Sequence, residues 1–247
     1  MLRNWAVAAL SVLLVAVPLT GRAQSDSPVR LVDFPTAYGL PRGMYSLGMR
    51  IVPAGGVIAG LGVGVTDYLL VGISYGAGNV VGSGEPEWDD RVEFDVKLKF
   101  AEEATAIPTM AIGYDSRGYG RQLEDGEYEK TSPGFYITAA KTMPFSEYYT
   151  FHAGLSRTLD QDRAKPDVIV GASARFSQEF TAIVEYEWGL ERDSEEPEGS
   201  SGYLNLGLRW VFAEQIEIDL YFRNLVGPSG SPELNSRAIG FVFYDSF

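Results

Sequence analysis

Hydrophobic and charged residues alternate without exception along residues 91–100, RVEFDVKLKF. Because successive side chains of a β-strand point to opposite faces, this segment predicts a strand with one apolar face and one ionic face. A soluble sheet would bury the apolar face and expose the charges to water. A transmembrane barrel would turn the apolar face to lipid and the charges to its lumen.

The same alternation recurs along the whole chain in segments of about ten residues, the length of a tilted membrane strand. The twelve segments are 43–52, 56–65, 68–78, 91–100, 107–116, 134–143, 147–157, 167–176, 180–190, 203–212, 215–224 and 237–247. Segment 134–143 alternates least well. Their number and spacing predict an all-β fold over 43–247, an antiparallel transmembrane β-barrel of about 12 strands.

The connections between these segments also follow a pattern. Those after the second, fourth, sixth, eighth and tenth segments are short, and those after the third, fifth, seventh, ninth and eleventh are longer and polar. Only the first connection, PAGG, is short where a long one is expected. Short periplasmic turns and longer, here acidic, extracellular loops are typical of bacterial outer-membrane barrels. Both termini are then expected on the periplasmic side.

A soluble all-β domain is the alternative, and two features argue against it. The polar face of the segments is rich in Gly and Ser, which weakens an ordinary strand but suits the crowded interior of a narrow barrel. The apolar face carries aromatic residues near the strand ends, such as Tyr45, Trp188 and Trp210. Aromatic girdles belong at the two interfaces of a bilayer. The charges of residues 91–100 should therefore line a lumen.

The N-terminal residues 1–23 have the pattern of a secretory signal peptide. Arg3 precedes an apolar run over 5–19, and Gly21 and Ala23 stand in small-x-small order before Gln24. The run is shorter than the roughly 20 residues of a membrane-spanning helix, so we expect cleavage near Ala23 and export. The expected location is the outer membrane of a Gram-negative-type bacterium.

Composition narrows the classes of function. The chain has no Cys, which excludes disulfides, thiol catalysis and Cys-ligated metal. Loss of residues 1–23, which hold two arginines and no acid, changes the formal net charge from −13 to −15. Such acidity argues against a nucleic-acid partner, which requires basic patches.

The C-terminal sequence GFVFYDSF ends on Phe247 and resembles the signal by which outer-membrane barrels are recognised for assembly. Asp245 departs from that pattern. The expected partners are accordingly the barrel-assembly machinery, through Phe247, and outer-membrane lipid with lipopolysaccharide. We expect a monomer.

Two stretches resemble one family. LVDFPTAYGLPRGMYSLG (31–48) and VEFDVKLKFAEEATAIPTMAIGYDSRGYG (92–120) are similar to the YjbH-type outer-membrane barrels associated with exopolysaccharide production. The better-known members are longer, so this chain corresponds to a single-barrel version. The resemblance implies a link to exopolysaccharide export and a saccharide partner. The residues that match the family opening are Asp33, Phe34, Pro35, Thr36, Ala37, Gly39, Pro41 and Gly43. They fall in or next to segment 24–42, which we expect to be a periplasmic or plug segment.

Catalytic chemistry finds little support. His152 is the only histidine, and Ser156 lies on the same strand face, but the HxSNG motif of barrel phospholipases is absent. Thr150 stands where the Asp-x-His pair of omptin proteases would need Asp. The glycine row Gly60, Gly62 and Gly64 is followed by another strand rather than by the helix of a phosphate-binding fingerprint. The acidic loops lack calcium-loop spacing. We therefore expect no catalytic residue, no cofactor and no metal site.

One set of residues does form a constellation, because its members alternate with the apolar face. The predicted lumen-lining residues are Arg50, Glu93, Asp95, Lys97, Lys99, Asp115, His152, Arg175, Glu185, Glu187, Arg209, Glu217, Asp219 and Arg223. One hypothesis is a passage or groove for a polar solute. The other is a closed structural or surface-interaction barrel, whose ion pairs only fill the interior. A barrel enzyme is a distant third.

Overall fold

The structure is a computed structural model that describes residues 28–82, 84–122, 128–130, 132–143, 146–159, 166–189, 202–226 and 235–247. The expected signal peptide lies outside these residues. Twelve long strands form the wall. They are β1 (Met44–Val52), β2 (Gly56–Gly64), β3 (Leu69–Gly78), β5 (Glu93–Ala101), β6 (Thr109–Asp115), β9 (Gly134–Met143), β10 (Ser146–Arg157), β11 (Asp167–Arg175), β12 (Phe180–Gly189), β13 (Tyr203–Phe212), β14 (Ile216–Arg223) and β15 (Ser236–Ser246).

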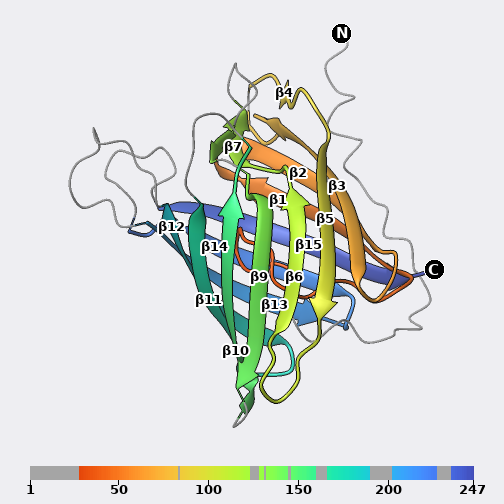
Figure 1. The fold of residues 1–247 in the computed structure, drawn as a ribbon. Helices are drawn as coiled ribbons and strands as arrows, with labels where there is room; N and C mark the ends of the chain where they lie inside the picture. Colours follow the sequence, from red (N-terminus) through yellow and green to blue (C-terminus); the bar gives the residue numbers. More distant parts are fainter. Residues whose placement is uncertain are drawn as a thin grey trace.

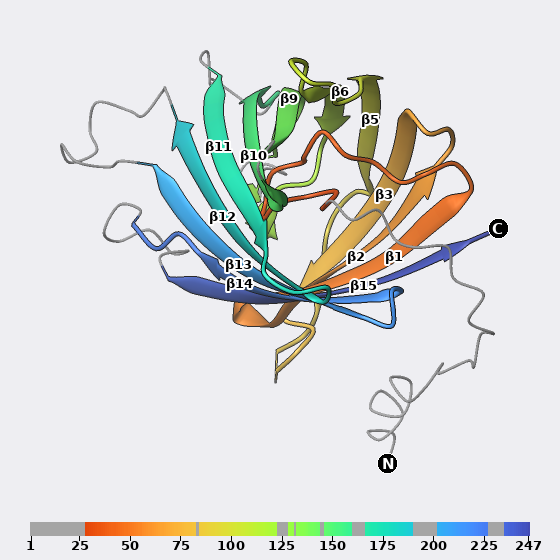
Figure 2. The same cartoon turned by 90° about the horizontal axis from the view of Figure 1, so that it is seen from below.

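Each long strand pairs antiparallel with its neighbours along the chain, and β15 pairs with β1 to close the ring. Figure 2 shows this ring nearly end-on. The fold class predicted from the alternation is confirmed: the chain forms a closed, antiparallel β-barrel of twelve strands. Full closure leaves no unpaired strand edge in the wall, as a bilayer requires.

Shorter elements that the alternation did not predict lie in the connections. They are a 3-10 turn, η2 (Pro53–Gly55), and the strands β4 (Glu87–Trp88), β7 (Tyr119–Gln122) and β8 (Tyr128–Lys130). β4 pairs with the end of β3, and β7 pairs with β8 as a separate hairpin. These elements gather at one end of the barrel, the loop end (Figure 1). The opposite end, the turn end, holds the other short connections and the C-terminus.

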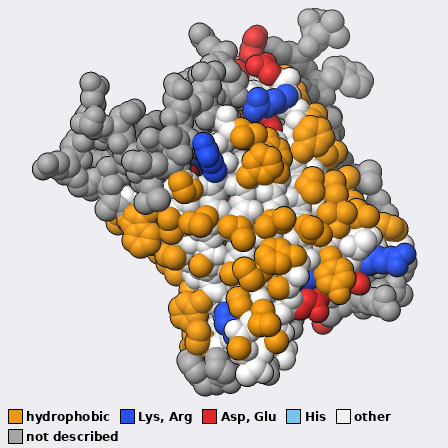
Figure 3. All heavy atoms as spheres, in the orientation of Figure 1, with side chains coloured by type: hydrophobic (Ala, Val, Ile, Leu, Met, Phe, Trp, Pro, Cys, Tyr) orange, Lys and Arg blue, Asp and Glu red, His pale blue; other side chains and the backbone are white. Residues whose placement is uncertain are grey.

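The orientation of the side chains answers the question that residues 91–100 raise. In β5, Glu93 and Lys97 are each 1% exposed, whereas Phe94 is 54% exposed and Leu98 43%. The charged face therefore points into the barrel and the apolar face points out. Other long strands repeat this arrangement, so that large apolar side chains cover the outside (Figure 3).

An exposed apolar surface of this extent is costly in water and favourable in lipid. Stacked aromatic side chains, such as Phe176, Phe180 and Trp210, lie on it near the turn end. The outer surface thus has the composition of a lipid-facing belt with an aromatic girdle. Within the part of the chain that the structure describes, no helix is long and apolar enough to cross a membrane.

Candidate functional site

The interior of the barrel is occupied by the beginning of the described chain. Residues 28–42 enter the ring and fold back on themselves (Figure 2), and we call them the N-terminal hairpin. Its turn is closed by hydrogen bonds from the Leu31 N–H to the Phe34 carbonyl (2.9 Å) and from the Thr36 N–H to the Val29 carbonyl (3.1 Å). Leu31 and Thr36 are fully buried, as are Val32 and Ala37. The buried core of the protein therefore lies within the lumen, around this hairpin.

Glycines on the lumen face make room for the hairpin. A Cβ atom on Gly154 of β10 would come within 2.5 Å of the Phe34 ring, and one on Gly171 of β11 within 2.6 Å of the Leu31 side chain. Real Cβ atoms do not approach other atoms so closely. The small residues of these strands thus form a seat into which the apolar side chains of the hairpin fit.

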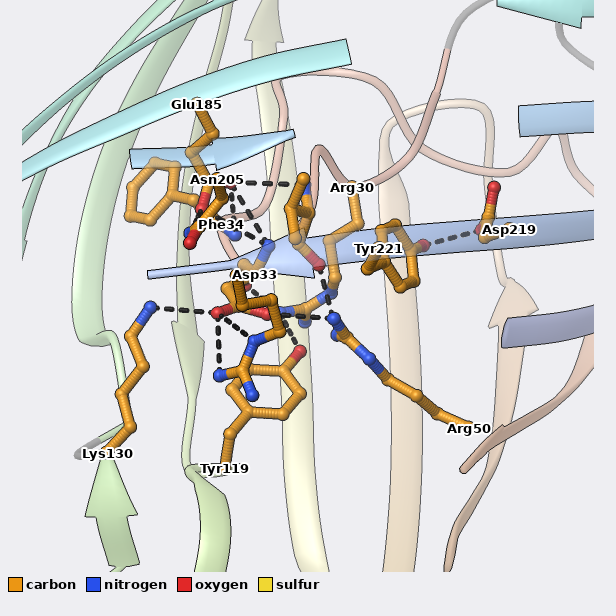
Figure 4. Close-up of polar contacts among 12 residues, drawn as sticks. Arg30, Asp33, Phe34, Arg50, Tyr119, Lys130, Glu185, Asn205, Asp219 and Tyr221 are labelled. Atoms are coloured by element: carbon orange, nitrogen blue, oxygen red, sulfur yellow. Dashed lines mark hydrogen bonds and ion pairs between the residues drawn. The ribbon is translucent and has the colours of Figure 1, made fainter. Parts of the chain in front are cut away.

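A carboxylate from the wall binds the tip of the hairpin. Glu185 of β12 accepts hydrogen bonds from the backbone N–H groups of Val32 (3.1 Å), Asp33 (3.1 Å) and Phe34 (3.0 Å). The side-chain amide of Asn205, on β13, donates to the same carboxylate at 2.7 Å (Figure 4). Successive N–H groups that converge on one anion form a nest. Glu185 is fully buried, so these donors replace the water that its charge has lost.

The side chain of Asp33 points away from Glu185 and meets three cations. Its carboxylate accepts from Arg50 Nη2, Lys130 Nζ and Arg223 Nε, each at 2.9 Å (Figure 4). These cations come from β1, from β8 at the loop end and from β14. One hairpin residue therefore links a loop to strands β1 and β14, which lie on either side of β15.

Electrostatics at Asp33 follow from this arrangement. Burial alone would raise the pKa of the Asp33 carboxyl, but Arg223, Lys130 and Arg50 outweigh burial and hold that pKa well below its usual range. Burial would likewise lower the pKa of Lys130, yet the attraction of Asp33 and nearby glutamates raises it above the ordinary value for lysine. Both groups therefore stay charged, and the ion pair persists, at neutral pH.

Further contacts hold the two arms of the hairpin. The guanidinium of Arg30 pairs with Asp115 at the end of β6. Lys97 of β5 donates to the carbonyl oxygens of Val29 and Tyr38, each at 2.9 Å, so one ammonium bridges both arms. The hairpin is thus attached to the wall through charged groups along its length.

The β7–β8 hairpin reaches in from the loop end. Tyr119 is buried, its hydroxyl accepts from Arg30 at 3.2 Å, and its ring lies 4.6 Å from the Arg50 guanidinium and 5.1 Å from that of Arg223. Through Tyr119 and Lys130, this loop packs on the tip of the N-terminal hairpin. Loop and hairpin together occupy the lumen on the side of β9–β12.

Space remains on the other side, along β1–β3 and facing parts of β13–β15. A cavity of about 360 Å³ opens at the loop end, the mouth cavity, and a second of about 240 Å³ lies deeper, the lumen cavity. The mouth cavity is bordered by Asn79, Glu87, Asp89, Asp90 and Gln122. The lumen cavity runs past Ser74, Gly72, Gly60, Gly62 and Ser46 toward Tyr244 near the turn end.

The predicted lumen-lining residues all lie inside the barrel wall or at its turn end. Nine are buried: Glu93, Lys97, Asp115, His152, Glu185, Arg209, Glu217, Asp219 and Arg223. Five are partly exposed: Arg50, Asp95, Lys99, Arg175 and Glu187.

They fall into separate groups rather than one site. Arg50, Glu185, Glu187 and Arg223 gather at the hairpin tip.

A second group lies on β13 and β14. Arg209 pairs there with Asp219 (2.8 Å) and Glu217 (3.0 Å). At the turn end, Lys99 pairs with Glu102 at 2.8 Å and Arg175 lies over the Tyr148 ring. These pairs cannot be predicted from the alternation, because it gives the face on which a residue lies and not its partner.

The environment of His152 fits a packing role. Its Nε2 is 3.2 Å from the Ser173 hydroxyl, and its ring lies edge-on to Tyr38 of the hairpin. Its Nδ1 has no hydrogen-bond partner among the described residues, so no acid orients the ring as catalysis would require. No group of three metal-ligating side chains is present in the described segments.

Several site residues were missed from the sequence. Among the residues singled out in the stretch 31–48, Asp33 to Ala37 form the tip and returning arm of the hairpin, and Gly39, Pro41 and Gly43 lead into β1. Arg30, Arg117 and Lys130, by contrast, lie outside the twelve segments. Loops have no periodicity, so nothing in the pattern marked these cations as facing the lumen.

Comparisons with known proteins bear on the fold. No protein-family model matches the chain. No curated protein matches it. Among solved structures, a KdgM porin is similar with a TM-score of 0.50 and 7% identity, over 83% of this chain and 99% of that one.

Two other solved porins are similar at lower TM-scores. A NanC porin gives 0.46 at 9% identity, over 82% of this chain and 99% of that one. A triple mutant of the porin of Rhodopseudomonas blastica gives 0.37 at 12% identity, over 77% of this chain and 55% of that one. The likeness to the KdgM porin shows that this chain shares the barrel fold of a porin.

Proposed function

We propose that the protein is an outer-membrane channel of narrow bore for small polar solutes. The observation that carries the proposal is the pair of cavities along β1–β3. Together they extend from the loop end to the neighbourhood of Tyr244, and polar or glycine residues line most of that distance. The shared fold with a porin supports the same conclusion.

In this proposal, the N-terminal hairpin is a constriction that narrows the lumen to one side. Its Leu40–Pro41 portion also lies against the turn end of β2, where a Cβ on Gly64 would come within 2.1 Å of the Pro41 carbonyl oxygen. Removing the hairpin should therefore widen the path both beside and below it.

Single-channel conductance in a planar bilayer tests the proposal, with the wild-type protein and a variant that lacks residues 24–42. We expect small, stable steps from the wild type and larger ones from the variant. Steps from the variant alone would make the hairpin a complete plug of a channel. A change of gel mobility on heating would show that each barrel is folded. Silence from both folded proteins would contradict a channel.

A closed structural barrel is the second candidate. It is favoured by the buried ion pairs of Asp33 with Lys130 and Arg223 and by the hydrogen bonds from the hairpin backbone to Glu185, which occupy the lumen around the hairpin tip. Such a protein would show no conductance. Its function would then be to bind partners through its loops, to bind lipopolysaccharide or to support the envelope.

The resemblance of residues 31–48 and 92–120 to YjbH-type barrels supports a finer proposal, in which the solute is a saccharide connected with exopolysaccharide export. Reversible block of the conductance by added oligosaccharides would support it. Fractionation with outer-membrane markers tests the location on which every version of the proposal depends.

A further inference from the structure

The two cavities along β1–β3 meet at one basic residue. Among the described residues, only Arg117 and Ile58 border both of them. Arg117 follows the end of β6, and its Nε donates to the Ser74 hydroxyl of β3 at 3.1 Å. The side chain therefore extends over the intervening strand β5 and is only 5% exposed.

Arg117 also connects two of the long connections at the loop end. Its Nη1 donates to Asp89 Oδ2 at 2.6 Å and lies 2.9 Å from the Tyr128 hydroxyl. That hydroxyl donates in turn to Glu93 at 3.0 Å. Asp89 belongs to the connection after β3 and Tyr128 to β8, so both connections are tied together where the mouth cavity ends.

Part of the Arg117 guanidinium remains without a partner. Its Nη2 is buried and makes no hydrogen bond to any described residue. Buried charged donors are seldom left unsatisfied, so water or a solute oxygen is expected to occupy this position. The atom belongs to a residue that borders both cavities, which places that position on the path between them.

A glycine in the barrel wall makes room for the ion pair between Arg117 and Asp89. A Cβ on Gly76 of β3 would lie 2.7 Å from Asp89 Oδ2 and 3.2 Å from Arg117 Nη1. Only glycine leaves room for the pair against the strand. The pair therefore fills the space between β3 and the loops and forms the narrow point of the path.

We infer that Arg117 determines the size and charge selectivity of this path, an inference that rests on the proposed channel function. At this narrow point Arg117 pairs with Asp89, so one cation balances one anion. Such a throat disfavours multiply charged ions of either sign. It accepts small neutral or zwitterionic solutes, whose oxygens bind Arg117 while their donors face the Asp89 carboxylate.

Reversal potentials across a KCl gradient test the inference. Arg117→Ala leaves Asp89 in the throat without its cation, so we expect a several-fold rise in the cation-to-anion permeability ratio and a larger conductance. Asp89→Asn should shift the ratio in the opposite direction, and Arg117→Lys should stay close to the wild type. The matched control is Arg237→Ala, because Arg237 is exposed on β15 and its loss changes the net charge equally.

Liposome swelling tests the solute class. The wild type should admit the zwitterion glycine faster than the ethylenediamine dication or the succinate dianion, and Arg117→Ala should gain the dication. Equal swelling rates for all three solutes with the wild type would refute the proposed preference for neutral or zwitterionic solutes.

Each result separates the inference from the proposed function. A conducting wild type whose selectivity and conductance respond alike to Arg117→Ala and Arg237→Ala would overturn the inference and leave the channel standing. A folded wild type that never conducts would overturn both. If Arg117→Ala does not assemble, Arg117→Lys and Asp89→Asn still decide, because an unshifted Asp89→Asn contradicts a charge-selective throat.

Discussion

Substitution of Asp33 by Asn should release the N-terminal hairpin from the wall. Asn keeps the shape of the side chain but removes the negative charge that Arg50, Lys130 and Arg223 share at 2.9 Å. The site is almost fully buried, with Asp33 3% and Arg223 1% exposed. Removing one partner of a buried ion pair costs about 3–5 kcal/mol, because the remaining charge is left uncompensated.

That cost should appear as a larger population of the released hairpin. Since about 1.4 kcal/mol corresponds to a tenfold change in an equilibrium, the open fraction should rise by a factor of roughly 10² to several 10³. Glu187, which pairs with Lys130 at 3.0 Å, compensates part of the charge and places the expected effect toward the lower end.

Cysteine accessibility measures this population directly, because the natural chain has no Cys. Val32→Cys places a thiol of similar size at the fully buried hairpin tip. Its rate of reaction with a charged methanethiosulfonate should be low in the otherwise wild-type barrel and much higher with Asp33→Asn. Asp33→Glu is the control that keeps the charge. Equal rates for Asp33→Asn and the wild type would refute the view that these ion pairs hold the hairpin in place.

Three further predictions address other parts of the account. The pKa of Asp33 is lowered in the folded protein. The stability that its carboxylate gives to the docked hairpin is therefore complete above the ordinary pKa of about 3.9, and it is lost as the pH falls through the lowered pKa. Conductance should thus stay constant from about pH 8 to about pH 5 and rise only below about pH 4, whereas a rise near neutral pH would exclude Asp33 as the cause. Gly154→Ala should displace Phe34 at a cost of about 1–3 kcal/mol and increase conductance, while Gly48→Ala, whose Cβ would meet no atom closer than 3.9 Å, should not. Val96→Arg, at the middle of the outward face of β5, should lower the folding stability in vesicles by about 2–4 kcal/mol. Phe100→Arg, near the turn end of the same face, should lower it by only about 0–1 kcal/mol. Equal losses of stability for the two variants would argue against a lipid-facing belt.

The fold could be predicted closely from the sequence because the two faces of a transmembrane strand meet different surroundings. Apolar and polar residues therefore alternate along the strand with a period of two. Residues 91–100 show this directly, since Glu93 and Lys97 face the lumen and Phe94 and Leu98 face outward, as their alternation predicts. Even segment 134–143, with the weakest alternation, is strand β9 with the same bounds. Lipid supplies the driving force, so each strand carries the signal independently of its partners.

The interior could be predicted only in part. Periodicity assigns a residue to the lumen face, but it does not show that Glu185 accepts from three successive N–H groups of the hairpin or that Arg209 pairs with Asp219. These contacts depend on the barrel register and on where the hairpin turns. The lumen-facing positions of Arg117 and Lys130 could not be predicted for a different reason. Both residues lie in connections that fold inward, and these connections have no periodic pattern.

The most direct test of the central claim, a polar path along β1–β3, is modification of single cysteines during channel recording. Ser74 and Ser46 border the lumen cavity, whereas Ser173 lies buried on β11 beside His152. A charged thiol reagent should reduce the current quickly through Ser74→Cys and Ser46→Cys, and slowly or not at all through Ser173→Cys. Rapid block at Ser173→Cys with no effect at the other two positions would place the path on the opposite side of the hairpin and contradict the account.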